Sequence, residues 1–287
     1  MTPLLSVRDL RVSFPTRSGT FEAVRGVSFD LGRERLGVVG ESGSGKSMTG
    51  RAILGLVRPP GKVTATRLDL DGAPILNLPE ARMRKLRGAR ISMVMQDPKF
   101  SLNPVMTVGR QIMEAYRIHS GTGAGAARQK ALEMLAAVQI RDPQRVFDAY
   151  PHEVSGGMGQ RVMIAMMLAP DPEILIADEP TSALDVSVRN EVLQIMDGLV
   201  RDRGMGLIFI SHDLNLVGQF CDRVLIMYAG RVVEELPARE LHNARHPYTR
   251  GLLDSLPRLD HPVDRLAVLQ RQDSWRDAEA MPLPGGL

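Results

Sequence analysis

Cysteine is almost absent from this 287-residue sequence, which contains a single one, Cys221. One thiol cannot form an internal disulfide framework or supply the ligands of an all-cysteine iron–sulfur cluster within the chain. The stretch from Leu256 to Leu287 also lacks a cysteine cluster, and its ending Pro282-Leu283-Pro284-Gly285-Gly286 predicts a loose tail. We therefore predict no iron–sulfur cluster, and we expect Cys221 to be a small buried residue.

Long hydrophobic runs are missing as well. No apolar stretch approaches the roughly twenty residues that a membrane span requires. The stretch from Met1 to Val12 carries Arg8, Asp9 and Arg11 where a signal peptide would need unbroken apolar residues. The sequence thus predicts neither a membrane span nor a signal peptide, and we expect the protein to stay in the cytoplasm.

Neither sign of charge dominates. The chain has 36 Lys and Arg residues against 33 Asp and Glu residues, a formal net charge of +3. This balance leaves nucleic acid and acidic membranes open as partners but points to neither.

Heptad patterns and internal repeats are not found in the sequence either. The length allows one large domain or two modest ones, and a hydrophobic content of 44% is enough for a sizeable core.

What the sequence does have is a complete phosphate-binding P-loop pattern, Gly40-Glu41-Ser42-Gly43-Ser44-Gly45-Lys46-Ser47. Leu36 to Val39 before it predicts a buried strand, and Met48 to Leu56 after it predicts a helix, which is the context that the motif requires. The glycines let backbone N–H groups approach a polyphosphate at a helix N-terminus. Lys46 is expected to reach the β- and γ-phosphates and Ser47 to bind Mg²⁺. The alternative is a glycine-rich turn that merely joins a strand to a helix.

Two alternating stretches precede this loop. Leu5 to Phe14 and Ala23 to Leu31 predict strands joined by a loop over Pro15 to Gly19, so residues 1–35 should form an antiparallel pair. Phe14, at a strand end, is equally compatible with stacking on a purine base and with ordinary core packing.

A continuous apolar run from Ile174 leads into Asp178 and Glu179, which predicts a strand buried on both faces of a parallel sheet. Asp178 can orient the Mg²⁺ shell, while Glu179 can polarise the attacking water near the γ-phosphate. Buried carboxylates are costly unless paired or bound to metal, which disfavours a purely structural role.

Two further strands end in polar residues. Ile91 to Gln96 ends in the glutamine, and His212 follows the strand Gly206 to Ile210. Ligands of open α/β sheets bind outside the carboxyl ends of the strands, so these side chains should face the same crevice. Taken alone, the glutamine is weak evidence for a ligand site, and the histidine is equally compatible with a structural and a functional role.

Between these strands the pattern becomes helical. Val105 to Tyr116 and Ala126 to Val138 predict helices with no strand between them, so residues 97–154 are interpreted as a helical insertion. Ser155-Gly156-Gly157 then opens a helix that runs to about Leu168. Its N–H groups form a second candidate anion site, although a lone Ser-Gly-Gly is more often a plain helix cap.

The ordered set of these motifs resembles the nucleotide-binding subunit of an ABC transporter over about residues 5–256. Wider stretches are similar to the oligopeptide, dipeptide and nickel importer branch of that family. In the family the motifs are the P-loop, the Q-loop (Gln96), the signature (Ser155-Gly156-Gly157), the Walker B pair (Asp178-Glu179), the D-loop (Asp185) and the switch histidine (His212). The stretches that point to the branch are Val39 to Gly45, Gln96-Asp97-Pro98 with Ser101-Leu102-Asn103-Pro104, Tyr150-Pro151-His152-Glu153 and His246-Pro247-Tyr248-Thr249.

The resemblance implies an α/β fold, with a P-loop NTPase (RecA-like) core, an N-terminal antiparallel β subdomain and an inserted α-helical subdomain. The core would comprise residues 1–96 and 155–235, the helical subdomain 97–154, and a C-terminal extension of the peptide importer type 236–287. The implied function is ATP hydrolysis that powers uptake of peptides or a related small solute, with nickel or a metal chelate as alternatives.

The implied partners are a second ABC cassette, homologous or identical, two membrane permease subunits and, indirectly, an extracytoplasmic solute-binding protein, with no nucleic acid. The protein would lie peripherally on the cytoplasmic face of the inner membrane. A soluble ABC-type ATPase acting on DNA or the ribosome remains an alternative, although such proteins usually carry a long coiled coil or two cassettes in one chain. An ABC exporter cassette is the nearer alternative.

The resemblance also assigns roles to residues. The catalytic residues would be Lys46, Gln96, Glu179 and His212, and Mg²⁺ would bind at Ser47, Gln96 and Asp178. Phe14 would stack on adenine, with Phe21 as the other candidate. The other nucleotide contacts would be Gly40, Glu41, Ser42, Gly43, Ser44, Gly45, Lys46, Ser47, Met48, Ser155, Gly156, Gly157 and Asp185.

Two positions depart from the family pattern. Val154 stands where Leu is usual, and Gly159 where this branch usually has Arg. Glycine in a helix interior costs about 1 kcal/mol, which lowers the expected stability of this helix. The Ser-Gly-Gly anion site is expected to work nonetheless.

Overall fold

The computed structural model describes residues 2–96, 101–182, 184–256, 269, 272–276 and 281. The chain forms two compact units. The first consists of Met1–Asn77 together with Phe209–Leu287, and the second of Leu78–Ile208. The domain boundaries expected from the sequence stay a prediction.

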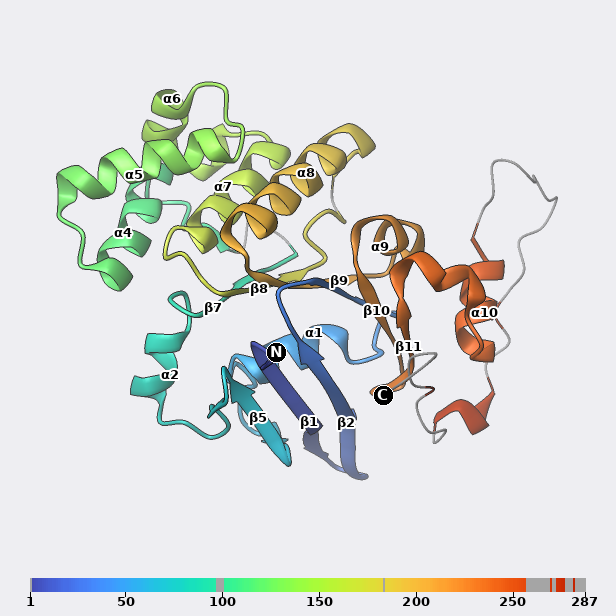
Figure 1. Cartoon of the computed structure of the whole chain (residues 1–287). Coiled ribbons are helices and arrows are strands. Elements are labelled where there is room, and N and C mark those ends of the chain that lie inside the picture. The colour runs from blue at the N-terminus through green and yellow to red at the C-terminus, as the bar shows by residue number, and fades with distance from the viewer. Residues whose placement is uncertain are drawn as a thin grey trace. The chain divides into compact units, whose positions relative to one another are not determined.

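An antiparallel sheet opens the first unit. Its strand order is β2-β1-β5-β6, and β4 pairs with β1. The predicted alternation holds on each side of an irregularity at Asp9, whose φ is 49°, because Leu5 and Val7 before it and Leu10 and Val12 after it are fully buried. The predicted pair of strands is confirmed, but its hairpin is tighter than expected, because Thr16 already pairs with Gly19. The strands, blue to cyan in Figure 1, are β1 (Leu5–Thr16), β2 (Gly19–Leu31), β4 (Lys62–Thr64), β5 (Arg67–Leu70) and β6 (Ala73–Pro74).

A second group of strands in the first unit carries the P-loop. The central strand β10 is parallel to β3 and antiparallel to β11. The predicted P-loop strand is confirmed as β3, and its helix α1 begins two residues earlier than expected and ends at Ile53. The elements are β3 (Arg35–Val39), α1 (Lys46–Ile53), α9 (Leu214–Phe220), β10 (Arg223–Tyr228), β11 (Arg231–Pro237), η2 (Ala238–Asn243), α10 (Pro247–Asp254) and η3 (Asp273–Arg276).

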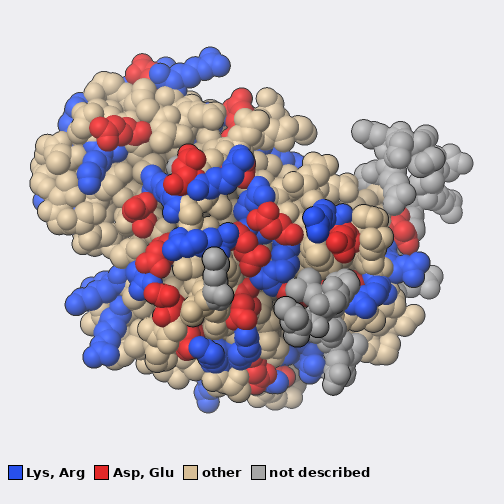
Figure 2. Space-filling model, in the orientation of Figure 1, with Lys and Arg blue, Asp and Glu red and all other residues tan. Residues whose placement is uncertain are grey.

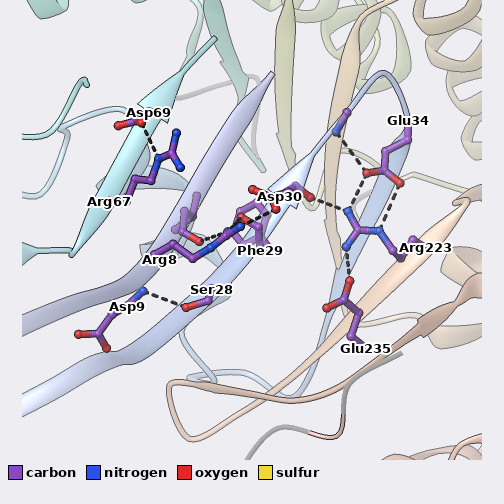
Figure 3. Close-up of polar contacts among 12 residues, drawn as sticks. Arg8, Asp9, Ser28, Phe29, Asp30, Glu34, Arg67, Asp69, Arg223 and Glu235 are labelled. Atoms are coloured by element: carbon purple, nitrogen blue, oxygen red, sulfur yellow. Dashed lines mark hydrogen bonds and ion pairs between the residues drawn. The ribbon is translucent and has the colours of Figure 1, made fainter. Parts of the chain in front are cut away.

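Arg223, at the start of β10, joins these strands through one guanidinium group (Figure 3). It donates to both carboxylate oxygens of Glu34, to the carbonyl of Asp30 and to the carboxylate of Glu235. Because the group is mostly buried and forks into several donors, it can hold three chain segments in one geometry.

The second unit contains the parallel pair β7 and β8. Every residue of both strands is buried, as the continuous apolar run ending at Asp178 predicts. The next strand, β9, is also buried throughout, and its sequence crosses from this unit into the first. The elements are α2 (Glu80–Leu86), β7 (Ile91–Val94), β8 (Ile174–Asp178), α8 (Val186–Arg203) and β9 (Gly206–Ser211).

Helices follow one another between β7 and β8, as expected, and α4, α5 and α6 pack together (Figure 1, green). The first begins at Val108 instead of Val105, because the Gln111 side chain bonds the backbone of Asn103 and Met106 and holds that stretch as a turn. The short helix α6 was not predicted. These elements are α4 (Val108–Ser120), α5 (Ala124–Ala137), α6 (Pro143–Asp148), η1 (Pro151–Glu153) and α7 (Gly156–Leu168).

Cys221 is buried, as predicted, and burial raises the pKa of its thiol far above the ordinary value. Within the described ranges, no helix has the length and apolar character that would let it cross a bilayer. Basic and acidic side chains are interspersed on the face shown in Figure 2. The predicted loose ending, residues 282–286, lies outside the described residues, and the absence of an iron–sulfur cluster stays a prediction.

Candidate functional site

The P-loop of the first unit closes around the ammonium group of Lys46. This side chain is only 6% exposed, and its Nζ donates to the carbonyl oxygens of Gly40 at 2.7 Å and Glu41 at 2.8 Å. A buried ammonium group is costly unless it is hydrogen-bonded, so these two carbonyls hold the charge inside the turn. The geometry agrees with the predicted role of Lys46 at a polyphosphate.

Two glycines let other backbone segments approach the loop closely. A Cβ added to Gly40 would lie 2.1 Å from the carbonyl oxygen of Met227, and one added to Gly45 would lie 2.6 Å from that of Ala23. Gly45 also has a φ of 100°, which disfavours side chains. Gly230 adds a hydrogen bond from its N–H to the carbonyl of Ser44 at 3.0 Å. The loop is therefore packed against β2 and against the turn between β10 and β11.

The helix after the loop supplies donors for an anion. The first backbone bond of this helix runs from Thr49 N–H to the carbonyl of Gly45, so the N–H groups that precede Thr49 have no acceptor within the helix. Ser42 and Gly43 are exposed, and Ser47 and Met48 are half-buried. This fits the predicted phosphate contacts.

The predicted adenine and switch residues of the first unit lie on separate elements. Phe14 is half-buried on β1 and pairs across the hairpin with Phe21, which is 58% exposed. The ring of Phe21 is thus the more exposed of the two. His212 is exposed just after β9, and the next residue, Asp213, caps α9 by accepting from Leu216 N–H at 3.0 Å.

In the second unit, the Walker B pair and the Q-loop glutamine meet. Asp178 ends β8 and is 5% exposed, and Glu179 follows it with a φ of 47°. Gln96 Nε2 donates to Glu179 Oε2 at 3.2 Å. Such a left-handed backbone is strained for a residue other than glycine and is often kept for a functional reason. The structure thus brings together two of the predicted catalytic side chains.

The signature turn lies in the same unit. Ser155 Oγ accepts from Met158 N–H at 3.3 Å and caps α7, while Gly156 is exposed. A Cβ added to Gly157 would lie 2.7 Å from Val188 Cγ1, whereas one added to Gly156 would meet nothing within 4 Å. The D-loop residue Asp185 caps the neighbouring helix by accepting from Val188 N–H at 3.0 Å. Despite Gly159, α7 runs unbroken to Leu168.

The predicted Mg²⁺ ligands have suitable chemistry. Ser47, Gln96 and Asp178 supply a hydroxyl, an amide and a buried carboxylate, and Mg²⁺ prefers oxygen ligands. In the part of the chain that the structure describes, no group of three or more His, Cys, Asp or Glu side chains is arranged as a metal cage. Mg²⁺ in nucleotide sites is held by one or two protein groups plus phosphates, so the oxygen atoms of these side chains, taken one by one, have the chemistry that this ion takes.

Comparison with known families decides which family the chain belongs to. Residues 24–182 match the model of the ABC transporter family, and residues 233–283 match the oligopeptide/dipeptide transporter C-terminal region. The chain belongs to the ABC transporter family. The first match includes the P-loop, Gln96, the signature and Walker B pair, whereas Phe14, Asp185 and His212 lie outside it.

Individual proteins support this assignment. The dipeptide transport ATP-binding protein DppD of Haemophilus influenzae is 46% identical over 269 residues, which cover 93% of this chain and 82% of that protein. Among solved structures, the dimeric post-hydrolysis state of the ATP-binding cassette MJ0796 with ADP and Pi has a TM-score of 0.74 and 27% identity, and covers 82% of this chain and 99% of its own. The cassette cbiO1 of Clostridium perfringens, part of the transporter complex cbiONQ, has a TM-score of 0.72 and 25% identity, and covers 85% and 92%.

These findings confirm the predicted α/β P-loop NTPase fold and the ABC-type ATPase, with ATP and Mg²⁺ as the nucleotide and ion of the family. The roles of single residues stay predictions. Sequence reasoning missed Tyr248, which accepts a hydrogen bond from the Glu41 N–H of the P-loop at 3.1 Å. The only signal for this residue was the resemblance of His246-Pro247-Tyr248-Thr249 to one branch of the family.

Proposed function

We propose that this ABC ATPase powers the uptake of peptides through separate permease subunits. The observation that carries the proposal is the match of residues 233–283 to the C-terminal region of oligopeptide/dipeptide transporters. The identity of 46% with a dipeptide transport ATP-binding protein agrees with it. Nickel or a metal chelate is the alternative solute, because the same branch resemblance extends to nickel importers.

The residues divide the chemistry between them. Lys46 and the N–H groups at the start of α1 bind the β- and γ-phosphates. Glu179 acts as the general base that positions the attacking water, and its bond to Gln96 holds the carboxylate in place before hydrolysis. His212 contacts the γ-phosphate region. When bound, Mg²⁺ neutralises charge on the phosphates, held by Ser47, Gln96 and Asp178.

The active unit is a pair of cassettes, identical or homologous. The P-loop encloses one polyphosphate with its own lysine, whereas Ser155 and Gly156 leave a helix N-terminus open to solvent. A cavity of about 380 Å³ borders this turn and is lined by Ser155, Gly157 and Arg161, among others. The open half-site suits the nucleotide bound by the partner's P-loop, as the dimeric neighbour suggests.

The helical segment 97–154 carries the contact with the permease. Its described part exposes two large apolar side chains, Val105 at 79% and Ile118 at 68%, which are available for contact with another protein. Docking there would place the chain on the cytoplasmic face of the inner membrane, with a solute-binding protein as an indirect partner. Contact of Gln96 with the γ-phosphate would then move the segment that follows it.

Reconstitution tests the function. The chain is co-purified with candidate permease subunits from its own organism, placed in proteoliposomes with a solute-binding protein and ATP, and offered labelled dipeptide, longer peptide or nickel. We expect ATP-dependent uptake of a peptide and none with Glu179→Gln, which is the matched control. Uptake of nickel alone would make the peptide assignment wrong. Failure to join any membrane subunit, with ATPase activity stimulated by nucleic acid or ribosomes, would favour the soluble alternative.

A further inference from the structure

One side chain of the C-terminal extension bonds the backbone of the P-loop. Tyr248, in the first turn of α10, is fully buried, and its hydroxyl accepts from the Glu41 N–H at 3.1 Å. The two residues are 207 positions apart in the chain. A buried tyrosine needs a partner for its hydroxyl, and here the partner is part of the P-loop.

The bond lies on the peptide group that Lys46 also uses. Gly40 contributes the carbonyl of this peptide and Glu41 its N–H. Lys46 Nζ bonds that carbonyl at 2.7 Å, while Tyr248 Oη bonds the N–H. Because a peptide group is planar and rigid, its rotation would displace both contacts together. The hydroxyl of Tyr248 therefore restrains the orientation of the carbonyl that holds the lysine.

The tyrosine is itself held firmly. Its ring lies 4.6 Å from that of Tyr228 and 6.1 Å from that of Trp275, measured between ring centroids. Its own N–H donates to His246 Nδ1 at 3.1 Å, which caps α10. Glu234, only 2% exposed on β11, accepts in turn from the backbone N–H groups of Arg245 and His246 at 2.6 and 3.2 Å. Side chains held by packing and by further hydrogen bonds are suited to positioning a site.

We propose that Tyr248 is a positioning residue for ATP binding, through which the C-terminal extension holds the P-loop in its nucleotide-competent form. Without the hydroxyl, the Gly40–Glu41 peptide can adopt other orientations in the empty loop. The apparent dissociation constant for ATP then rises, because it is inversely proportional to the fraction of molecules whose P-loop is in the nucleotide-competent form. ATP restores the arrangement once it is bound, so turnover at saturating ATP should change little.

The test compares Tyr248→Phe with Tyr228→Phe in the full-length chain. Both variants remove one hydroxyl from the same aromatic cluster and keep the ring, but only Tyr248 bonds the P-loop. We expect the Kd for Mg·ATP to rise on the order of tenfold in Tyr248→Phe, the size associated with one lost buried hydrogen bond, while kcat stays within about twofold. Tyr228→Phe should bind like the unmodified chain. An unchanged Kd in Tyr248→Phe, or an equal rise in both variants, would overturn the proposal.

A second measurement needs no variant. Hydrogen exchange of the nucleotide-free chain should show the Glu41 amide protected, because it donates to a buried acceptor. Rapid exchange at that amide would contradict the bond on which the proposal rests. The proposal requires only ATP binding at this P-loop and holds for any transported solute. Lys46→Ala serves as the reference: if it binds Mg·ATP normally, the assignment of the nucleotide site is wrong and not merely the role of Tyr248.

Discussion

The two helix N-termini of this cassette that offer an anion site differ in how complete they are. The P-loop contains its own cation, Lys46, and backbone from Ala23 and Met227 approaches its glycines closely. The signature turn has the Ser155 cap, and Ser155 and Gly156 are exposed. The comparison teaches that the P-loop holds its cation inside the turn, whereas the signature turn leaves its N–H donors open to solvent beside a cavity lined by Arg141, Arg145 and Arg161, which suits it to complete a site on another molecule.

The largest expected effect separates ATP binding from ATP hydrolysis. Glu179→Gln should reduce turnover by about 10²–10⁴-fold, the usual contribution of a general base, while ATP affinity is kept. The amide oxygen of glutamine can still accept the bond from Gln96, so the local geometry is preserved. Single-turnover hydrolysis and a filter-binding Kd measure the two effects. Hydrolysis at the normal rate would show that another group is the base.

The next largest effect concerns the cation inside the P-loop. Lys46→Ala removes a buried ammonium group and leaves the carbonyls of Gly40 and Glu41 without its two bonds. We expect the Kd for Mg·ATP to rise by about a hundredfold, because charge-assisted hydrogen bonds are worth about 1.5–3 kcal/mol each before any compensation. Titration calorimetry measures the change, with Lys62→Ala, an exposed lysine on β4, as the control.

A pair of glycine variants sharpens the contrast with the open site. Gly156→Asp places a carboxylate at the signature in open space, whereas Gly157→Asp would also press against Val188. Both should impair the ATP site built on the partner's P-loop about tenfold or more, by repelling phosphate. Only Gly157→Asp should lower the melting temperature as well. The assay uses cassette pairs in which only one of the two chains keeps its P-loop lysine, so that the two ATP sites are measured separately. Impairment of the site containing Lys46 of the variant chain itself would contradict the proposed pairing, in which the signature of one cassette completes the ATP site on the P-loop of the other.

The smallest effect is a pH dependence of folding stability at His246, the residue that caps α10. Burial lowers the pKa of His246, and the Glu234 carboxylate partly opposes this shift. Above pH ~6.5 the imidazole is neutral in both folded and unfolded chains; below it the unfolded chain takes up the proton first, so stability falls as pH falls towards the lower folded-state pKa. The loss is at most about 1.4 kcal/mol per pH unit.

Urea unfolding at pH 7.5 and 5.5 measures this loss of stability. The loss of stability between these two pH values should be smaller in His246→Asn, because the asparagine oxygen can cap α10 without titrating. An equal loss in both proteins would assign the pH dependence to other groups.

Local pattern was sufficient for much of this molecule. The P-loop with its strand and helix, the buried strand ending in Asp178, and the serine that caps α7 follow from residue types at short spacing. Helix and strand ends were less predictable. Val105 lies outside α4, for example, because the side chain of Gln111, six residues later in the sequence, bonds the intervening turn.

By itself, then, the sequence determined which residues can bind phosphate, carry a proton or cap a helix, because those capacities belong to side chains and to glycine backbone. Only the tertiary structure decided which distant segments restrain them. The carbonyl of Met227 against Gly40, the bond of Gln96 to Glu179 and the hydroxyl of Tyr248 on the P-loop join residues 83 to 207 positions apart. Such contacts form when buried polar groups find hydrogen-bond partners after strands and helices have packed. The short-range pattern of apolar and polar residues does not predict which distant groups will pair.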